Sequence, residues 1–163
     1  MISEDAKQKM RDAVAKYPVA RSALLPALRI AQEEEGYITP QGIQAVAQII
    51  GVHEDEVTSI ASFYTMYHAK PKGKYVVKVC NSIGCYLRGC DNLLKQLEDE
   101  LGVQPGQTSA DGLVTLETAE CMASCGTAPV LQLDDEFVEQ LTPERVHEIV
   151  LKINNFSGRT PGD

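Results

Sequence analysis

Apolar residues in the first part of the chain recur every three or four positions, which is the period of an amphipathic helix. This pattern predicts four helices, over residues 4–17, 22–35, 40–50 and 54–64. Ser3 is a suitable N-cap for the first helix. Gly36 and Gly51 follow the second and third helices, where glycine commonly ends a helix. Thr39-Pro40 combines an N-cap with proline at the first helical position. The sequence therefore predicts a small helical bundle.

The period changes at the segment KPKG (residues 70–73), after which apolar and polar residues alternate as they do in β-strands. Strands are predicted over residues 75–79, 113–116, 130–133 and 137–138, and helices over residues 88–101 and from Thr142-Pro143 onward. The order β-α-β-β-β-α packs a pair of helices on a small mixed sheet, which is an α+β architecture. We expect two domains, an N-terminal helical bundle over residues 1–70 and an α+β domain over residues 71–163.

All five cysteines fall in the second predicted domain. Cys80 and Cys85 form a C-x4-C pair directly after the first strand. Cys121 and Cys125 form a C-x3-C pair in a loop between two later strands, and Cys90 stands outside both pairs. Two loops at the same edge of one sheet can bring four thiolates together, as a tetrathiolate metal site requires.

Spacing alone leaves three interpretations of the paired cysteines open. Structural zinc sites mostly use tight C-x2-C pairs, with at most about four intervening residues. The wider pairs suit a 2Fe-2S cluster, in which each pair holds one iron, and C-x4-C also begins the pattern of plant-type ferredoxins. A thiol-disulfide enzyme normally carries C-x-x-C, and the chain contains no such motif.

Composition and charge argue against nucleic acid and a membrane as binding partners. The 163-residue chain has a formal charge of −8, which argues against nucleic acid because phosphate backbones require a basic surface. Residues 1–70 carry 7 basic and 9 acidic side chains, whereas residues 71–163 carry 8 and 14, so the cysteine-bearing part is the acidic one. No secretory signal is visible, and no apolar run approaches the roughly 20 residues of a membrane span. We expect a cytoplasmic protein with no direct membrane insertion.

Four segments carry a resemblance to a known family: VCNSIGCYLRG, LGVQPGQTSADGLVTLETAECMASCGTAPVLQLDDE, EEEGYITPQGI and VTSIASFYTMY. They closely resemble the thioredoxin-like 2Fe-2S subunit of bacterial NADH-quinone oxidoreductase, which is the E subunit of respiratory complex I. The match extends over nearly the whole chain in the right order. The resemblance implies a thioredoxin-like 2Fe-2S ferredoxin fold for the second half of the chain.

The resemblance also implies a site and a function. The family's cluster ligands fall on Cys80, Cys85, Cys121 and Cys125, which would hold one 2Fe-2S cluster. The chain would be the iron-sulfur subunit of an NADH dehydrogenase (quinone), in the peripheral arm of a membrane-bound complex on its cytoplasmic side. FMN and NADH are expected only on a partner flavoprotein subunit. No nucleotide-binding motif or catalytic dyad is visible here, so we expect no independent oxidation of NADH.

Two alternatives to this function stay open. Family members of the same subunit type also serve NAD-dependent hydrogenases and formate dehydrogenases. A zinc-stabilised adaptor is the alternative from another class, since zinc also binds four thiolates.

Further expectations concern the surroundings of the predicted ligands. Cys90 lies outside the family's ligand pattern, and its spacing to Leu94 and Leu97 places it on a buried helix face as a small core thiol. Plant-type clusters with four cysteines have potentials on the order of −400 mV. Nearby carboxylates lower the potential further because they oppose the added electron, and the sequence offers four candidates: Glu117, Glu120, Asp134 and Asp135.

Overall fold

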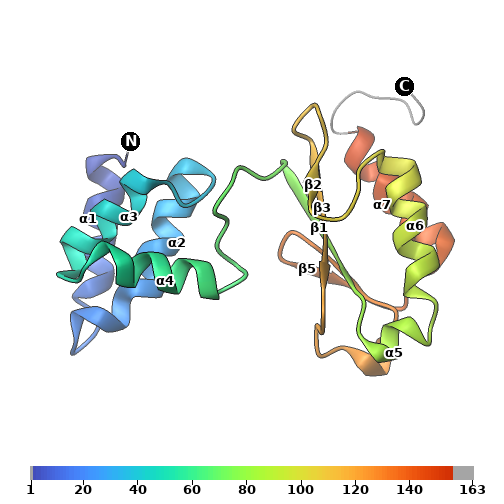
Figure 1. The fold of residues 1–163 in the computed structure, drawn as a ribbon, viewed down its shortest axis with the longest axis horizontal. Coiled ribbons are helices and arrows are strands. Elements are labelled where there is room, and N and C mark those ends of the chain that lie inside the picture. Colours follow the sequence, from blue (N-terminus) through green and yellow to red (C-terminus); the bar gives the residue numbers. More distant parts are fainter. Residues whose placement is uncertain (1, 156–163) are drawn as a thin grey trace. The chain divides into compact units, whose positions relative to one another are not determined.

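Residues 2–155 of the chain are described by a computed structural model, whose fold is drawn in Figure 1. The chain divides into two units, the first ending at Pro71 and the second beginning at Lys72. Each unit buries a hydrophobic core of its own. Within the described residues, no helix is both long enough and apolar enough to span a bilayer.

The first unit is built from helices, as the apolar periodicity predicts. Its elements are α1 (Glu4–Val14), the 3-10 helix η1 (Ala20–Ala23), α2 (Leu24–Glu35), α3 (Pro40–Ile50) and α4 (Glu54–Phe63). Each α-helix contributes at least one fully buried side chain to a shared core, of which the largest are Met10, Leu28, Val46 and Val57. The bundle is therefore held together by the apolar stripe of each helix.

Local signals set several of the helix ends. The Ser3 hydroxyl accepts a hydrogen bond from the backbone N–H of Ala6 at 3.1 Å, and the Thr39 hydroxyl accepts one from Gly42 at 2.9 Å. Gly51 ends α3 in the left-handed conformation, with φ of 80°, which glycine adopts without a steric penalty. The first helix is shorter than predicted, because the N–H of Tyr17 bonds to the carbonyl of Val14 in a turn.

The second unit has the predicted α+β architecture. Its elements are β1 (Tyr75–Cys80), α5 (Ile83–Tyr86), α6 (Cys90–Leu101), β2 (Gln107–Thr108), β3 (Val114–Ala119), the 3-10 helix η2 (Cys125–Thr127), β4 (Leu131–Leu133), β5 (Glu136–Val138) and α7 (Pro143–Asn155). The sheet order is β2-β3-β1-β4-β5. Only the β1–β3 pair is parallel, so the sheet is mixed.

Helices α6 and α7 cover one side of this sheet in Figure 1. The core between them and the strands includes Leu97 of α6, Val146 and Val150 of α7, and the strand residues Val77, Leu116 and Leu131. Three elements of this unit were not predicted: the four-residue helix α5, the two-residue strand β2 and the 3-10 helix η2. Strand β3 also continues to Ala119, beyond its predicted end.

The register of the strands brings several chain segments to one edge of the sheet. Cys80 at the end of β1 lies opposite Ala119 at the end of β3, and the two strands run in the same direction. Val79 lies opposite Leu131 at the start of β4, and Leu131 lies opposite Val138 at the end of β5. The loops that follow β1 and β3 and the segments that flank β4 and β5 therefore meet at this edge.

Candidate metal centre

Two loops at this sheet edge carry the four cysteines that the sequence predicts as ligands. Cys80 is the last residue of β1, and Cys85 lies in α5 directly after it. Cys121 comes two residues after the end of β3, and Cys125 opens the 3-10 helix η2. The parallel pairing of β1 and β3 places the two loops side by side.

The first pair is assembled by the turn of α5. The thiol of Cys85 is hydrogen-bonded to the sulfur of Cys80, and both side chains are almost completely buried, with 2% and 1% of their surface exposed. Cys80 and Cys85 pack in an apolar cluster with Ala128 and Val130. This pair is thus shielded from water on the protein side.

The second pair approaches the first from the loop after β3. A Cβ placed on Gly84 would lie 3.7 Å from the sulfur of Cys125, so Cys125 faces the turn that holds Cys85. The backbone N–H of Met122 donates a hydrogen bond to the sulfur of Cys80. In Figure 1, α5 and the segment around η2 lie next to each other at the same end of the second unit. Cys125 and the backbone of the loop that carries Cys121 therefore lie beside the first pair.

Cys121 is the predicted ligand with the least contact to the others. Its sulfur accepts a hydrogen bond from the backbone N–H of Ala123 at 3.4 Å, and its side chain is exposed. Ala123 holds a left-handed backbone, with φ of 56°, which is unusual for alanine. Met122, directly before this turn, donates its N–H to the Cys80 sulfur.

The surroundings of the first pair shift the pKa values of its two thiols in opposite directions. Burial raises the pKa of Cys80, but the N–H groups of Ser82 and Met122 and the thiol of Cys85 donate to its sulfur, and together they bring its pKa below the ordinary value. Burial raises the pKa of Cys85, and so does its hydrogen bond to the Cys80 sulfur. The backbone N–H groups thus stabilise negative charge on Cys80, as a metal-bound thiolate requires.

Cys90 has the surroundings of a core thiol. It begins α6, and 1% of its surface is exposed. Burial and the nearby carboxylate of Asp91 raise its pKa to about 11, so it is protonated at neutral pH. The prediction that Cys90 lies on a buried helix face is confirmed.

The residues present fit a 2Fe-2S cluster. Such a cluster takes two protein thiolates on each iron and bridges the irons with sulfide, so it needs two pairs that face each other across a gap. The Cys80–Cys85 pair and the facing Cys125 offer three such thiols, and Cys121 lies in the same loop as Cys125. Within residues 2–155, no three or more His, Cys, Asp or Glu side chains are grouped so as to hold a single metal ion.

Of the four carboxylates that the sequence suggested, Glu120 directly precedes Cys121 after the end of β3, whereas the other three are paired or lie elsewhere. Glu117 is paired with Lys72 and Lys78, so its charge is compensated. Asp134 accepts a hydrogen bond at 2.8 Å from the N–H of Val76, four residues before Cys80 along β1. It therefore lies toward the opposite end of the strand, and Asp135 follows it in the same turn.

Glu139 was not among the carboxylates predicted from the sequence. Its carboxylate accepts hydrogen bonds from the hydroxyls of Ser124 and Thr127, which flank Cys125. No local signal could have identified it, since 13 residues separate Glu139 from Cys125. Only the pairing of β4 with β5 brings Glu139 back to the cysteine loop.

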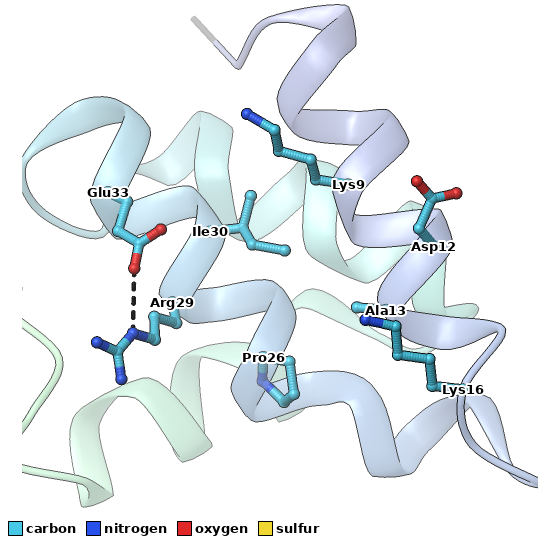
Figure 2. Close-up of a pocket in the computed structure, with 8 residues that line it drawn as sticks. All are labelled: Lys9, Asp12, Ala13, Lys16, Pro26, Arg29, Ile30 and Glu33. Atoms are coloured by element: carbon cyan, nitrogen blue, oxygen red, sulfur yellow. Dashed lines mark hydrogen bonds and ion pairs between the residues drawn. The ribbon is translucent and has the colours of Figure 1, made fainter.

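A separate hollow lies in the first unit, between α1 and α2 (Figure 2). It has a volume of about 470 Å³ and is lined by Lys9, Asp12, Ala13, Lys16, Pro26, Arg29, Ile30 and Glu33. Arg29 is paired with Glu33 at 3.0 Å, and Lys9 is paired with Asp5 at 2.6 Å. Because Arg29 and Lys9 are already paired with carboxylates, we assign the hollow no ligand.

Curated relatives match most of the chain. The NADH-quinone oxidoreductase E subunit of Mycobacterium tuberculosis strain H37Rv is 40% identical over 151 residues, which are 93% of this chain and 60% of that protein. The second subunit of the Thermus thermophilus NADH-quinone oxidoreductase is 39% identical, over 90% of this chain and 83% of the relative. An E-type subunit of the Rhizobium meliloti NADH-quinone oxidoreductase is also 39% identical, over 88% and 86%. The chain thus spans about 60% of the length of the mycobacterial relative.

A solved structure and a family model complete the comparison. The crystal structure of an NAD+-reducing [NiFe]-hydrogenase in the air-oxidized state aligns with a TM-score of 0.71 at 19% identity, over 80% of this chain and 23% of that one, and shows the same fold. The family model described as thioredoxin-like [2Fe-2S] ferredoxin matches residues 10–154. The predicted fold and 2Fe-2S cofactor are thereby confirmed: the chain belongs to the thioredoxin-like [2Fe-2S] ferredoxin family.

Proposed function

We propose that the chain is an electron-transfer subunit of an NADH:quinone oxidoreductase and carries one 2Fe-2S cluster on Cys80, Cys85, Cys121 and Cys125. The observation that carries the proposal is the meeting of the two cysteine pairs at one sheet edge, where Cys125 faces the Cys80–Cys85 pair beside Gly84. The three curated relatives are all named as subunits of such an oxidoreductase.

The cluster supplies one-electron chemistry, and the chain's own residues set the conditions for it. The backbone N–H groups of Ser82 and Met122 point at the Cys80 sulfur, where they stabilise negative charge. The apolar cluster around Cys80 and Cys85 excludes water from one side of the site. Cys121 and Cys125 are exposed, so the other side is accessible to a partner.

The proposed partner is the flavoprotein subunit of the same complex, which would hold FMN and NADH. A hydride brings two electrons to a flavin, and an iron-sulfur cluster takes them one at a time. An apolar surface suited to protein contact lies beside Cys85, where Ile83, Tyr86 and Leu87 are exposed. We place the assembly in the peripheral arm of the complex, on the cytoplasmic side of the membrane.

The two units are proposed to be two domains with separate roles. The second holds all four predicted ligands, and the first has a complete core of its own. Phe63 and Met66, at the end of the first unit, expose 75% and 55% of their surfaces. We infer that the first domain, residues 1–70, contacts the flavoprotein subunit through exposed apolar side chains such as these.

One experiment separates this function from its alternatives. Anaerobic purification of the full chain, followed by iron, zinc and acid-labile sulfide analysis, is expected to give two irons and two sulfides per chain. The reduced protein should give a rhombic EPR signal of spin one-half. One equivalent of zinc without sulfide would instead support the zinc-stabilised adaptor. Co-purification of the complex from its native source then distinguishes quinone reduction from the hydrogenase and formate dehydrogenase alternatives by the partner chains recovered.

A further inference from the structure

Glu139 joins the segment after β5 to the loop that carries Cys125. One carboxylate oxygen, Oε1, accepts hydrogen bonds from the hydroxyls of both Ser124 and Thr127, the latter at 2.7 Å. The two hydroxyls also lie 3.0 Å from each other. The three side chains therefore form one connected group around the turn that contains Cys125.

The backbone ties the same two segments together. The N–H of Gln140 donates to the carbonyl of Thr127 at 2.7 Å. The guanidinium of Arg145, in the first turn of α7, donates to the carbonyl of Glu139 at 2.8 Å. Glu139 is therefore held from the α7 side while its side chain holds the cysteine loop.

The backbone conformation at both ends of this connection is unusual. Ala123 and Gln140 have φ values of 56° and 51°, in the left-handed region that residues other than glycine seldom adopt. Such conformations cost free energy and persist where surrounding contacts hold them. Between these positions, the Ser124 hydroxyl donates to Glu139 and the N–H of Gln140 donates to the carbonyl of Thr127.

The strand register places the carboxylate at the cluster edge of the sheet. Val138 lies opposite Leu131, which lies opposite Val79, the residue before Cys80. Ser124, which binds the carboxylate, is the neighbour of Cys125 in the chain. Since neighbouring Cα atoms are about 3.8 Å apart, the charge lies on the order of 10 Å or less from the Cys125 sulfur.

We propose that Glu139 is a positioning residue for the metal centre, which braces the Cys125 turn through Ser124 and Thr127 and lowers the reduction potential of the cluster by its negative charge. This inference rests on the proposed function, because it assigns the cluster to this loop. Hydrogen bonds from Ser124 and Thr127 hold the pKa of Glu139 below its usual value, so the carboxylate is charged at neutral pH.

The two roles have different physical consequences. Addition of one electron takes a 2Fe-2S centre with four thiolates from a net charge of −2 to −3, so a nearby carboxylate opposes reduction. The carboxylate is exposed to solvent, which screens its charge, and we expect an effect of about threefold on the oxidised-to-reduced equilibrium. The hydrogen bonds of Glu139 with Ser124 and Thr127, which form the brace, instead affect how long the loop keeps Cys125 in place.

Two substitutions separate the charge from the brace. Glu139→Gln removes the charge but keeps an amide oxygen that can accept from both hydroxyls. Glu139→Ala removes both the charge and the acceptor. Glu136→Gln is the matched control, because Glu136 is also an exposed carboxylate on β5 but lies opposite Leu133, away from the cysteine edge.

The test uses the full chain purified anaerobically, with dithionite titrations followed by EPR and with the rate of cluster loss to a chelator. Glu139→Gln is expected to raise the potential by about 30 mV, which is threefold at 59 mV per factor of ten, and to lose its cluster at the wild-type rate. Glu139→Ala should show the same shift and lose its cluster several times faster. Glu136→Gln should match the wild type in both measurements.

The inference is overturned if the wild type carries the cluster and Glu139→Gln leaves its potential unchanged, or if Glu139→Ala retains the cluster as long as the wild type. A wild-type chain without iron and sulfide would instead refute the proposed function. The brace is still tested in that case by amide hydrogen exchange of residues 121–127, which Glu139→Ala should accelerate. Exchange at the wild-type rate would overturn the brace as well.

Discussion

Gly84 lies against Cys125, and a Cβ on Gly84 would stand 3.6 Å from the Cβ and 3.7 Å from the sulfur of Cys125. These are ordinary van der Waals distances, so the protein itself has room for an added methyl group. That methyl group would, however, occupy the space between the turn of Cys85 and the facing Cys125, which is where the proposed cluster has to fit. An added methyl group at this position is therefore compatible with the fold but not with the proposed cluster.

Gly84→Ala should stabilise the apoprotein and weaken the cluster site. Gly84 is helical and does not have a left-handed φ, so alanine is expected to raise the free energy of unfolding by about 0.4–1 kcal/mol. Iron and sulfide per chain should fall severalfold. Gly126→Ala is the control, because a Cβ there meets nothing within 4 Å. Full cluster content in Gly84→Ala would contradict the proposed position of the cluster.

The two neighbouring buried cysteines should respond differently to removal. Cys85→Ala takes away a proposed ligand and should abolish or degrade the EPR signal of the reduced protein. Cys90→Ala removes a buried, protonated thiol and should keep the signal, at a cost of about 1 kcal/mol in stability. Loss of the signal in Cys90→Ala with its retention in Cys85→Ala would show that Cys90 is the ligand.

Core substitutions in the two units test whether they are separate domains. Leu28 and Leu97 are both fully buried, the first in the helical bundle and the second under the sheet. Each Leu→Ala substitution should cost about 2–5 kcal/mol. Calorimetry of the full chain should show that Leu28→Ala lowers one unfolding transition and Leu97→Ala another, with faster cluster loss only in Leu97→Ala. A single transition shifted equally by both would argue for one cooperative core.

Elements with strong local signals were predictable from the sequence. Helix α3 begins after the N-cap Thr39 with Pro40 and ends at Gly51. These signals lie in the local sequence and need no tertiary contact. The same holds for the start of α7 at Pro143 and for its buried face. In contrast, β2 has only two residues, and both are exposed. It therefore has no alternation of apolar and polar residues from which a strand could be predicted.

The cysteine ligands could likewise be predicted from the sequence, whereas the carboxylate near them could not. The spacing within each cysteine pair is local, and the position of both pairs after strands indicated one shared edge. Which carboxylate reaches that edge depends on the register between β4 and β5, which places Asp134 at the far end of β1 and Glu139 beside Ser124. Register between short strands is set by tertiary packing, so the sequence pointed to the wrong aspartates.

Removal of the first unit should separate cluster binding from partner binding. A fragment of residues 72–163 keeps the core built from α6, α7 and the sheet, together with all four proposed ligands. We expect it to fold and to hold two irons and two sulfides. It should fail to co-purify with the flavoprotein subunit, because the proposed docking domain is absent.

A matched variant of the full chain makes this test independent of truncation. Phe63→Ser with Met66→Ser removes two exposed apolar side chains at the end of the first unit and should leave its core intact, since neither is buried. Affinity for the flavoprotein subunit should fall at least tenfold, with cluster content unchanged. A fragment that unfolds or loses its iron would instead mean that the helical bundle stabilises the cluster domain. In that case the exposed aromatic end of α4 would have to be explained without a docking role.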